Sequence, residues 1–312
     1  MAEPRAIKGV FRAKPTVEGA GVHLRRVFGF REVPQFDPFL LLDDFSSNHP
    51  DKYIKGFPWH PHRGIETITY VVAGDVEHGD SLGNSGVIHS GDVQWMTAGS
   101  GIIHQEMPKG DERGRMWGFQ LWANLPASEK MMAPRYRDVV SADIPVVKLD
   151  NGITVKIICG EFQGQVGPAR DIVINPQYLD IALPPGGQHF QPIAAGHAAF
   201  AYVFEGRGLF CGQKDPLAFK AEGENYFDLN RDPFVASGNL VLFGDGDGVT
   251  VSAAEEPVRF LMVSGPPLGE PVAWAGPIVM NTREELRTAL DEYQNGTFIK
   301  NPAPGSGTGS SN

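Results

Sequence analysis

The chain has 312 residues, of which 41% are hydrophobic and 21% are charged, as expected for a globular protein with a substantial core. The net charge of −10 and the scarcity of clustered lysine and arginine exclude a large nucleic-acid-binding face. No stretch resembles a signal peptide or a membrane span, and two isolated cysteines, Cys159 and Cys211, favour a reducing compartment. We therefore expect a cytoplasmic protein that binds neither membrane nor nucleic acid.

The elements predicted along the chain are mostly short β-strands. Residues 66–77 are rich in β-branched and aromatic side chains and break at Ala73-Gly74-Asp75, which predicts strand, tight turn and strand. Residues 89–107 pass from a Gly-Asp turn through an apolar stretch and two glycines into a second short strand, and residues 114–125 predict another. The 38 glycines and 25 prolines agree with many turns.

Helical periodicity is scarce. One helix is predicted over residues 284–294, with Asn281 as its N-cap, Glu284 three residues later as a partial capping box, and Gly296 beyond its end. A shorter helix is predicted after Pro126, over residues 127–133.

The chain also repeats itself weakly. The segment "TYVVAGDV" (69–76) aligns with "AYVFEGRG" (201–208), and "GDVQWM" (91–96) aligns with "GNLVLF" (238–243). The shared order of these matches predicts two β domains of similar build. We expect a first domain at 1–140, a second at 150–298 that includes the C-terminal helix, and a disordered tail at 299–312.

A polar cluster occurs in only one copy of the repeat. His60 and His62 lie two residues apart at a predicted strand, and His104 and Glu106 have the same spacing. Side chains at i and i+2 of a strand share a face, so each pair points one way. If the two segments meet in a barrel, three imidazoles and one carboxylate converge, and this donor set suits iron, zinc, copper, nickel, cobalt or manganese. Spacing leaves open whether Glu66 or Glu106 is the carboxylate ligand.

Other polar residues have simpler interpretations. We expect His78 and His89 to be solvent-exposed, and Arg63 to be either a solvated side chain or a cation near the mouth of the site that steers an anionic substrate.

Long segments of the chain resemble the pirin family of the cupin superfamily. They include "DPFLLLDDF" (37–45), "HPHRGIETITYV" (60–71), "GDVQWMTAGSGIIHQE" (91–106) and "GPIVMNTREEL" (276–286), so the resemblance covers most of the chain. Pirins are bicupins, and the resemblance implies an all-β fold with two cupin barrels in tandem and a few short helices.

The resemblance also implies a metal site. Pirins usually hold iron, here Fe(II), in the N-terminal domain alone, and the matching ligands are His60, His62, His104 and Glu106. Glu66, which we expect to share strand parity and hence a face with His62, then remains a candidate proton acceptor or hydrogen-bond partner of a ligand imidazole.

Several pirins are described as quercetin dioxygenases, which implies a flavonol-like aromatic substrate and dioxygen. In that chemistry a carboxylate, Glu106 or Glu66, takes the proton of the 3-hydroxyl, and ring cleavage releases carbon monoxide and a depside. The alternative that the resemblance offers is an iron-dependent co-regulator that binds a protein partner.

Overall fold

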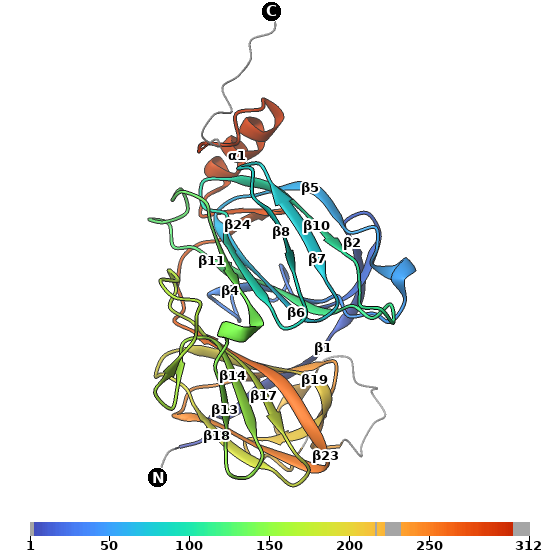
Figure 1. Cartoon of the computed structure of the whole chain (residues 1–312). Helices are drawn as coiled ribbons and strands as arrows, with labels where there is room; N and C mark the ends of the chain where they lie inside the picture. The colour runs from blue at the N-terminus through green and yellow to red at the C-terminus, as the bar shows by residue number, and fades with distance from the viewer. Residues whose placement is uncertain (1–2, 216, 222–231, 302–312) are drawn as a thin grey trace, which may run out of the picture. The chain divides into compact units, whose positions relative to one another are not determined.

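Nearly all regular structure in the chain is β-strand. The structure is a computed structural model, and it describes residues 3–215, 217–221 and 232–301 (Figure 1). The prediction of an all-β chain is confirmed in these ranges. Most of the tail predicted to be disordered, from residue 302 onward, lies outside the described residues.

The chain forms two compact units, and each unit is assembled from stretches that are separated in the sequence. Continuous domains at 1–140 and 150–298 were expected from the sequence, whereas both units contain residues from the N-terminal part of the chain. Unit 1 comprises Met1–Pro15, Arg25–Asp43 and Ser141–Leu268, and unit 2 comprises Thr16–Leu24, Asp44–Val140 and Gly269–Asn312. The chain passes between the units at five points, and three of these lie within strands: β2 (Lys14–Glu18), β3 (Val22–Phe28) and β4 (Phe39–Asp44).

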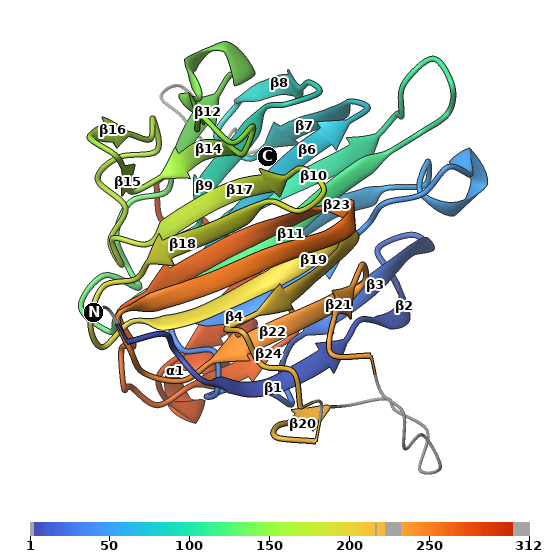
Figure 2. The same ribbon diagram turned by 90° about the horizontal axis from the view of Figure 1, so that it is seen from below.

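Unit 1 is built on one sheet of ten strands in which the long strands β19 and β23 are central (Figure 2). Its core consists of aliphatic and aromatic side chains from most of these strands. The strands of the sheet are β1 (Ile7–Arg12), β13 (Val146–Lys148), β14 (Thr154–Cys159), β17 (Gln177–Leu183), β18 (Gln188–Pro192), β19 (Ala198–Phe210), β20 (Lys220–Ala221), β21 (Val235–Ala236), β22 (Asn239–Phe243) and β23 (Gly248–Gly265); a separate hairpin is formed by β15 (Glu161–Phe162) and β16 (Gln165–Val166).

Unit 2 contains a four-stranded sheet in the order β5-β10-β7-β8 and the strands β12-β9-β6-β11, which are consecutive in a seven-stranded sheet (Figure 1). Side chains of the two sheets meet in a shared interior, where Val71 and Met116 pack with Val76 and Ile88. The strands are β5 (Phe57–His62), β6 (Ile65–Ala73), β7 (Val76–Asp80), β8 (Ser85–Ile88), β9 (Val93–Thr97), β10 (Ile102–Pro108), β11 (Trp117–Asn124) and β12 (Arg135–Val139), and the hairpin β24 (Ala273–Ala275) with β25 (Ile278–Met280) follows later in the chain.

The strand pairing reproduces the internal repeat. In each unit a tyrosine of one aligned segment pairs with a residue of the other: Tyr70 with Val93 in unit 2, and Tyr202 with Leu240 in unit 1. On its other side Tyr70 pairs with Phe119, and Tyr202 pairs with Leu261.

The described residues form a single α-helix, α1 (Arg283–Gln294). Thr282, not Asn281, is its N-cap: the Thr282 hydroxyl accepts a hydrogen bond from the amide of Glu285, and the Glu285 carboxylate accepts one from the amide of Thr282. The helix predicted at 127–133 is wrong, because these residues form turns; the other helical segments are 3-10 turns at Pro50–Lys52 and Ser141–Asp143. No helix in the described part of the chain is long and apolar enough to cross a membrane.

Candidate metal centre

Three histidines from two neighbouring strands of unit 2 come together. β5 and β10 are antiparallel, and their register places His60 directly opposite His104, while His62 lies opposite Ile102. The alternating burial of β10 shows that His104 and Glu106 face inward and Ile103 and Gln105 do not. The ring centroid of His104 lies 4.5 Å from that of His60 and 5.0 Å from that of His62.

The nitrogen atoms of this cluster are arranged for a cation. Nε2 of His60 lies 3.0 Å from Nε2 of His62 and 3.0 Å from Nε2 of His104. His60 Nδ1 donates to the carbonyl of Pro58 at 2.8 Å, and His62 Nδ1 donates to that of Pro277 at 3.2 Å. A carbonyl only accepts, so Nδ1 carries the proton of each neutral ring and Nε2 keeps its lone pair. Lone pairs that face each other repel, and a bound cation turns that repulsion into attraction.

Burial keeps these imidazoles neutral, which is the form that binds metal. Desolvation lowers the pKa of His60, and it lowers the pKa values of His62 and His104 well below the usual histidine value, with the neighbouring rings adding to the effect. Within the described ranges, this is the one group of histidine, cysteine or acidic residues whose ligand atoms all lie within 4.8 Å of one another. The donor set fits a divalent metal ion.

Glu106 lies on the same face of β10 as His104 but is held by other side chains. Its Oε1 accepts a hydrogen bond from Thr69 Oγ1 at 2.8 Å, and its Oε2 accepts one from Gln120 Nε2 at 2.9 Å. Burial raises the pKa of the Glu106 carboxyl, although both hydrogen bonds act in the opposite direction. The structure therefore places a buried, relatively basic carboxylate two residues from a histidine of the cluster.

Glu66 lies apart from the cluster. On β6 it is three residues from Thr69, whose hydroxyl reaches Glu106, so the alternation of a strand directs Glu66 to the opposite face. There its Oε1 accepts a hydrogen bond from Thr97 Oγ1 at 2.7 Å. The expectation that Glu66 shares a face with His62 carried strand parity across Gly64, where the backbone turns with a φ of 77°.

Three residues beside the cluster, Thr69, Gln120 and Trp122, were not predicted from the sequence. Thr69 and Gln120 fix the Glu106 carboxylate, and they are paired across β6 and β11. The indole of Trp122, two residues further on β11, lies edge-to-face with His62 at 5.1 Å between ring centroids. The sequence did contain a signal: in "FQLW", Gln120 and Trp122 are two residues apart on a predicted strand, which places them on one face.

Two interpretations of polar residues need correction. His78 is buried, not solvated: its Nε2 accepts a hydrogen bond from Gln94 Nε2 at 2.9 Å, and its ring stacks on Tyr136. Arg63 is also buried, with 2% of its side chain exposed, and it forms an ion pair with Glu292, so it cannot steer a substrate from solution. His89 is exposed as expected.

Unit 1 also has a buried histidine, but its surroundings differ from those of the cluster in unit 2. It contains a cavity of about 550 Å³ whose lining includes His189, Gln191 and Phe162. His189 Nε2 is hydrogen-bonded to Gln191 Oε1 at 3.2 Å, and valines stand opposite both residues on β23. Among the described residues of unit 1, no group of three or more metal-ligating side chains forms around this histidine.

Comparison with known proteins agrees with this architecture. A family model described as Pirin matches residues 21–123, and one described as Pirin C-terminal cupin domain matches residues 178–299. The chain is 42% identical to a pirin-like protein of Caulobacter vibrioides, over 94% of this chain and 99% of the relative. It is 40% identical to human pirin, over 89% of this chain and 88% of the relative.

A solved structure is similar over almost the whole chain. It is a quercetin 2,3-dioxygenase from Acinetobacter baumannii, with a TM-score of 0.81 and 30% sequence identity, and the match covers 95% of this chain and 98% of that one. These similarities confirm the predicted fold class of tandem cupin domains.

Proposed function

We infer that this chain, which belongs to the pirin family, is a metal-dependent dioxygenase that cleaves a ring of a flavonol-like substrate. The observation that carries the proposal is the convergence of three Nε2 atoms, two of which belong to rings whose Nδ1 is fixed by a backbone carbonyl. The substrate class is supported by the similarity to a quercetin 2,3-dioxygenase.

The ligands that we assign are His60, His62, His104 and Glu106. Fe(II) is the metal that we propose, because imidazole and carboxylate suit iron and because zinc, which the same donors would accept, has no redox chemistry. The bound ion supplies Lewis acidity toward a substrate hydroxyl and electron transfer toward dioxygen.

Glu106 is the group that we assign to proton transfer. Its raised pKa makes it a stronger base than an exposed glutamate, so its carboxylate oxygen can take the proton of the flavonol 3-hydroxyl. Thr69 and Gln120 hold both carboxylate oxygens in place, and the Gln120 amide remains a donor when one oxygen becomes protonated. In the overall reaction one flavonol and one dioxygen give one depside and one carbon monoxide, so every atom is accounted for.

Aromatic side chains beside the cluster suit a flat substrate. The ring centroid of Trp122 is 5.1 Å from that of His62 and 5.9 Å from that of Trp274. Such rings provide an apolar surface on which an aromatic body can stack, while the imidazoles and Glu106 engage its hydroxyl groups.

The test combines metal analysis with turnover. Protein loaded anaerobically with Fe(II) is mixed with quercetin and air, and both the loss of flavonol absorbance and the release of carbon monoxide are followed. We expect turnover in the wild type, no metal retention in His104→Ala, and full activity in His189→Ala, which removes the histidine of the unit 1 cavity. Stoichiometric metal without loss of quercetin or carbon monoxide release would contradict the proposal.

A further inference from the structure

Residues 273–301, here called the C-terminal strap, pack against the two strands that carry the histidines. The strap consists of β24, β25, α1 and the residues up to 301, all within unit 2. It contacts residues adjacent in sequence to the ligands: Arg63 follows His62, and Ile103 precedes His104. Because neighbouring side chains alternate, Arg63 and Ile103 point toward the strap while the adjacent imidazoles face the cluster.

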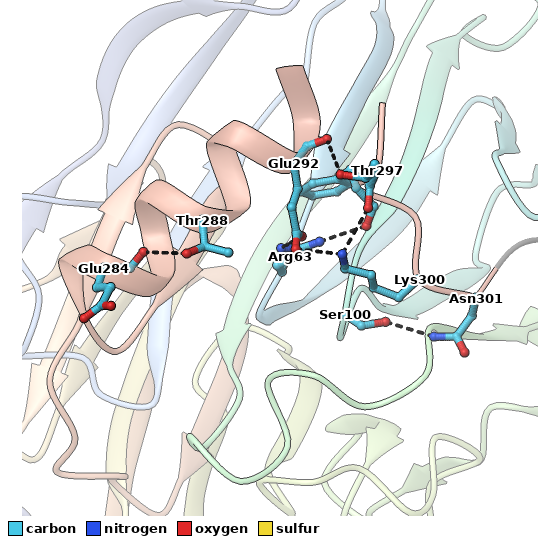
Figure 3. Close-up of polar contacts among 9 residues, drawn as sticks. Arg63, Ser100, Glu284, Thr288, Glu292, Thr297, Lys300 and Asn301 are labelled. Atoms are coloured by element: carbon cyan, nitrogen blue, oxygen red, sulfur yellow. Dashed lines mark hydrogen bonds and ion pairs between the residues drawn. The ribbon is translucent and has the colours of Figure 1, made fainter. Parts of the chain in front are cut away.

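Arg63, the residue directly after β5, makes three side-chain contacts with the strap. Its Nη1 donates to Glu292 Oε2 at 2.7 Å (Figure 3). Its Nη2 donates to the carbonyl of Phe298 at 2.8 Å, and its guanidinium lies 4.2 Å from the centre of the Phe298 ring. Glu292 is shared, since its other oxygen pairs with Lys300 at 2.7 Å. A buried guanidinium strongly favours these partners over water, so Arg63 ties the residue next to His62 to the strap.

Backbone contacts reinforce this link. The amide of Val279 donates to the Arg63 carbonyl at 3.1 Å. Gly64 follows with a φ of 77°, and a Cβ at this position would collide with the Val279 carbonyl. The buried ammonium of Lys130 bridges the same two elements, donating to the carbonyls of Gly64 at 2.8 Å and Val279 at 3.0 Å. Glycine at 64 therefore permits an approach that no other residue would allow.

The strap also packs closely against β10 and the residues just before it. Ile103 packs against a cluster of buried strap residues: Ile278, Met280, Ala289 and Phe298. Gly101, just before β10, has a φ of 136°, and a Cβ there would lie 3.0 Å from the Phe298 ring and from its carbonyl oxygen. Asn301 Nδ2 donates to Ser100 Oγ at 3.0 Å (Figure 3).

One contact reaches a ligand directly. The carbonyl of Pro277, in the strap, accepts the hydrogen bond of His62 Nδ1 at 3.2 Å and so fixes the tautomer in which Nε2 faces the cluster. Partners of this kind orient a metal-binding histidine and strengthen its binding.

We propose that docking of the C-terminal strap and occupancy of the metal site are thermodynamically coupled, with Arg63 and Glu292 as positioning residues that carry the coupling. This rests on the metal site of the proposed function. Coupling is reciprocal: if the docked strap raises metal affinity by a given factor, bound metal stabilises the docked strap by the same factor. The consequence is that α1, which supplies no ligand, responds to metal.

The first arm of the test measures Co(II) affinity by competition with a chelator, together with the visible spectrum of the Co(II) protein. We expect Glu292→Ala and Arg63→Met each to bind Co(II) about tenfold more weakly than wild type and to alter the spectrum. Glu284→Gln, an exposed change on the same helix, should match the wild type. The double variant Arg63→Met/Glu292→Ala, which leaves no unpaired buried charge, should lose no more affinity than either single variant.

The second arm measures hydrogen exchange of residues 283–298 in the full chain, with Co(II) and with chelator. We expect metal to slow exchange in α1 of the wild type by about the same tenfold factor and to have little effect in the double variant. Equal exchange with and without metal in the wild type, or unchanged Co(II) affinity in a folded double variant, overturns the coupling. A wild type that binds no Co(II), Fe(II) or Ni(II) instead overturns the proposed function.

Discussion

The buried ammonium of Lys130 makes stability depend on pH in a direction that can be calculated. Its side chain is 2% exposed, and Nζ donates to the carbonyls of Gly64 and Val279 and to Asn124 Oδ1. Desolvation lowers the pKa of Lys130 from 10.5 to about 8, in spite of the nearby Glu270 and Glu285. The folded state therefore releases this proton more readily than the unfolded chain does.

Between these two pKa values the unfolded chain binds more protons, so the free energy of unfolding rises with pH. Below pH 8 the full free-energy cost of burying the charged ammonium is present, and above pH 10.5 that cost has disappeared. At about 1.4 kcal/mol per pH unit, the wild type should gain roughly 2 kcal/mol relative to Lys130→Met between about pH 7.5 and about pH 9.5.

Urea unfolding of both proteins in chelator, at the two pH values, measures this difference directly. In the difference between wild type and Lys130→Met, the contributions of most other titrating groups to the pH dependence of unfolding cancel. Lys109→Met removes an exposed lysine that pairs with Glu77 and serves as the control, with a difference that we expect to change little with pH. If the difference in unfolding free energy between wild type and Lys130→Met changes with pH as little as that of the control, the ammonium is not buried as described and the reasoning fails.

Three further predictions concern the site and the strap. Glu106→Gln should reduce quercetin turnover by about 10²–10⁴-fold while the protein still retains metal, whereas Glu66→Gln, on the other face of β6, should leave both turnover and metal content near wild type; the reverse ranking refutes our assignment. Because burial lowers the pKa values of His62 and His104, Co(II) affinity measured by chelator competition should change little from about pH 7.5 to about pH 6, and a decline that follows an ordinary histidine pKa argues against burial. Thr282→Ala removes the capping hydroxyl of α1 and should lower the free energy of unfolding by about 1 kcal/mol in a urea titration, and an unchanged midpoint contradicts this role.

The parts of the site that follow from local periodicity were predictable. His60 and His62 share a face because they are two apart on one strand, and the same holds for His104 and Glu106. That parity failed for Glu66, because it holds only within an uninterrupted strand and the turn at Gly64 intervenes.

Contacts between distant residues could not be read from the sequence. The burial of Arg63 depends on Glu292 and Phe298, more than two hundred residues later, and nothing local to "HPHRG" indicates it. The start of α1 was missed by one residue for a different reason. Asn281 and Thr282 are both good N-caps, and each is followed three residues later by a glutamate, so only the geometry distinguishes them.

Anomalous diffraction from crystals of the full chain loaded with Fe(II), with data collected on both sides of the iron absorption edge, tests the central claim most directly. We predict one peak per chain, within about 2.0–2.2 Å of Nε2 of His60, His62 and His104. A peak bound elsewhere, or none at these nitrogens in protein that retains its fold, would contradict the account.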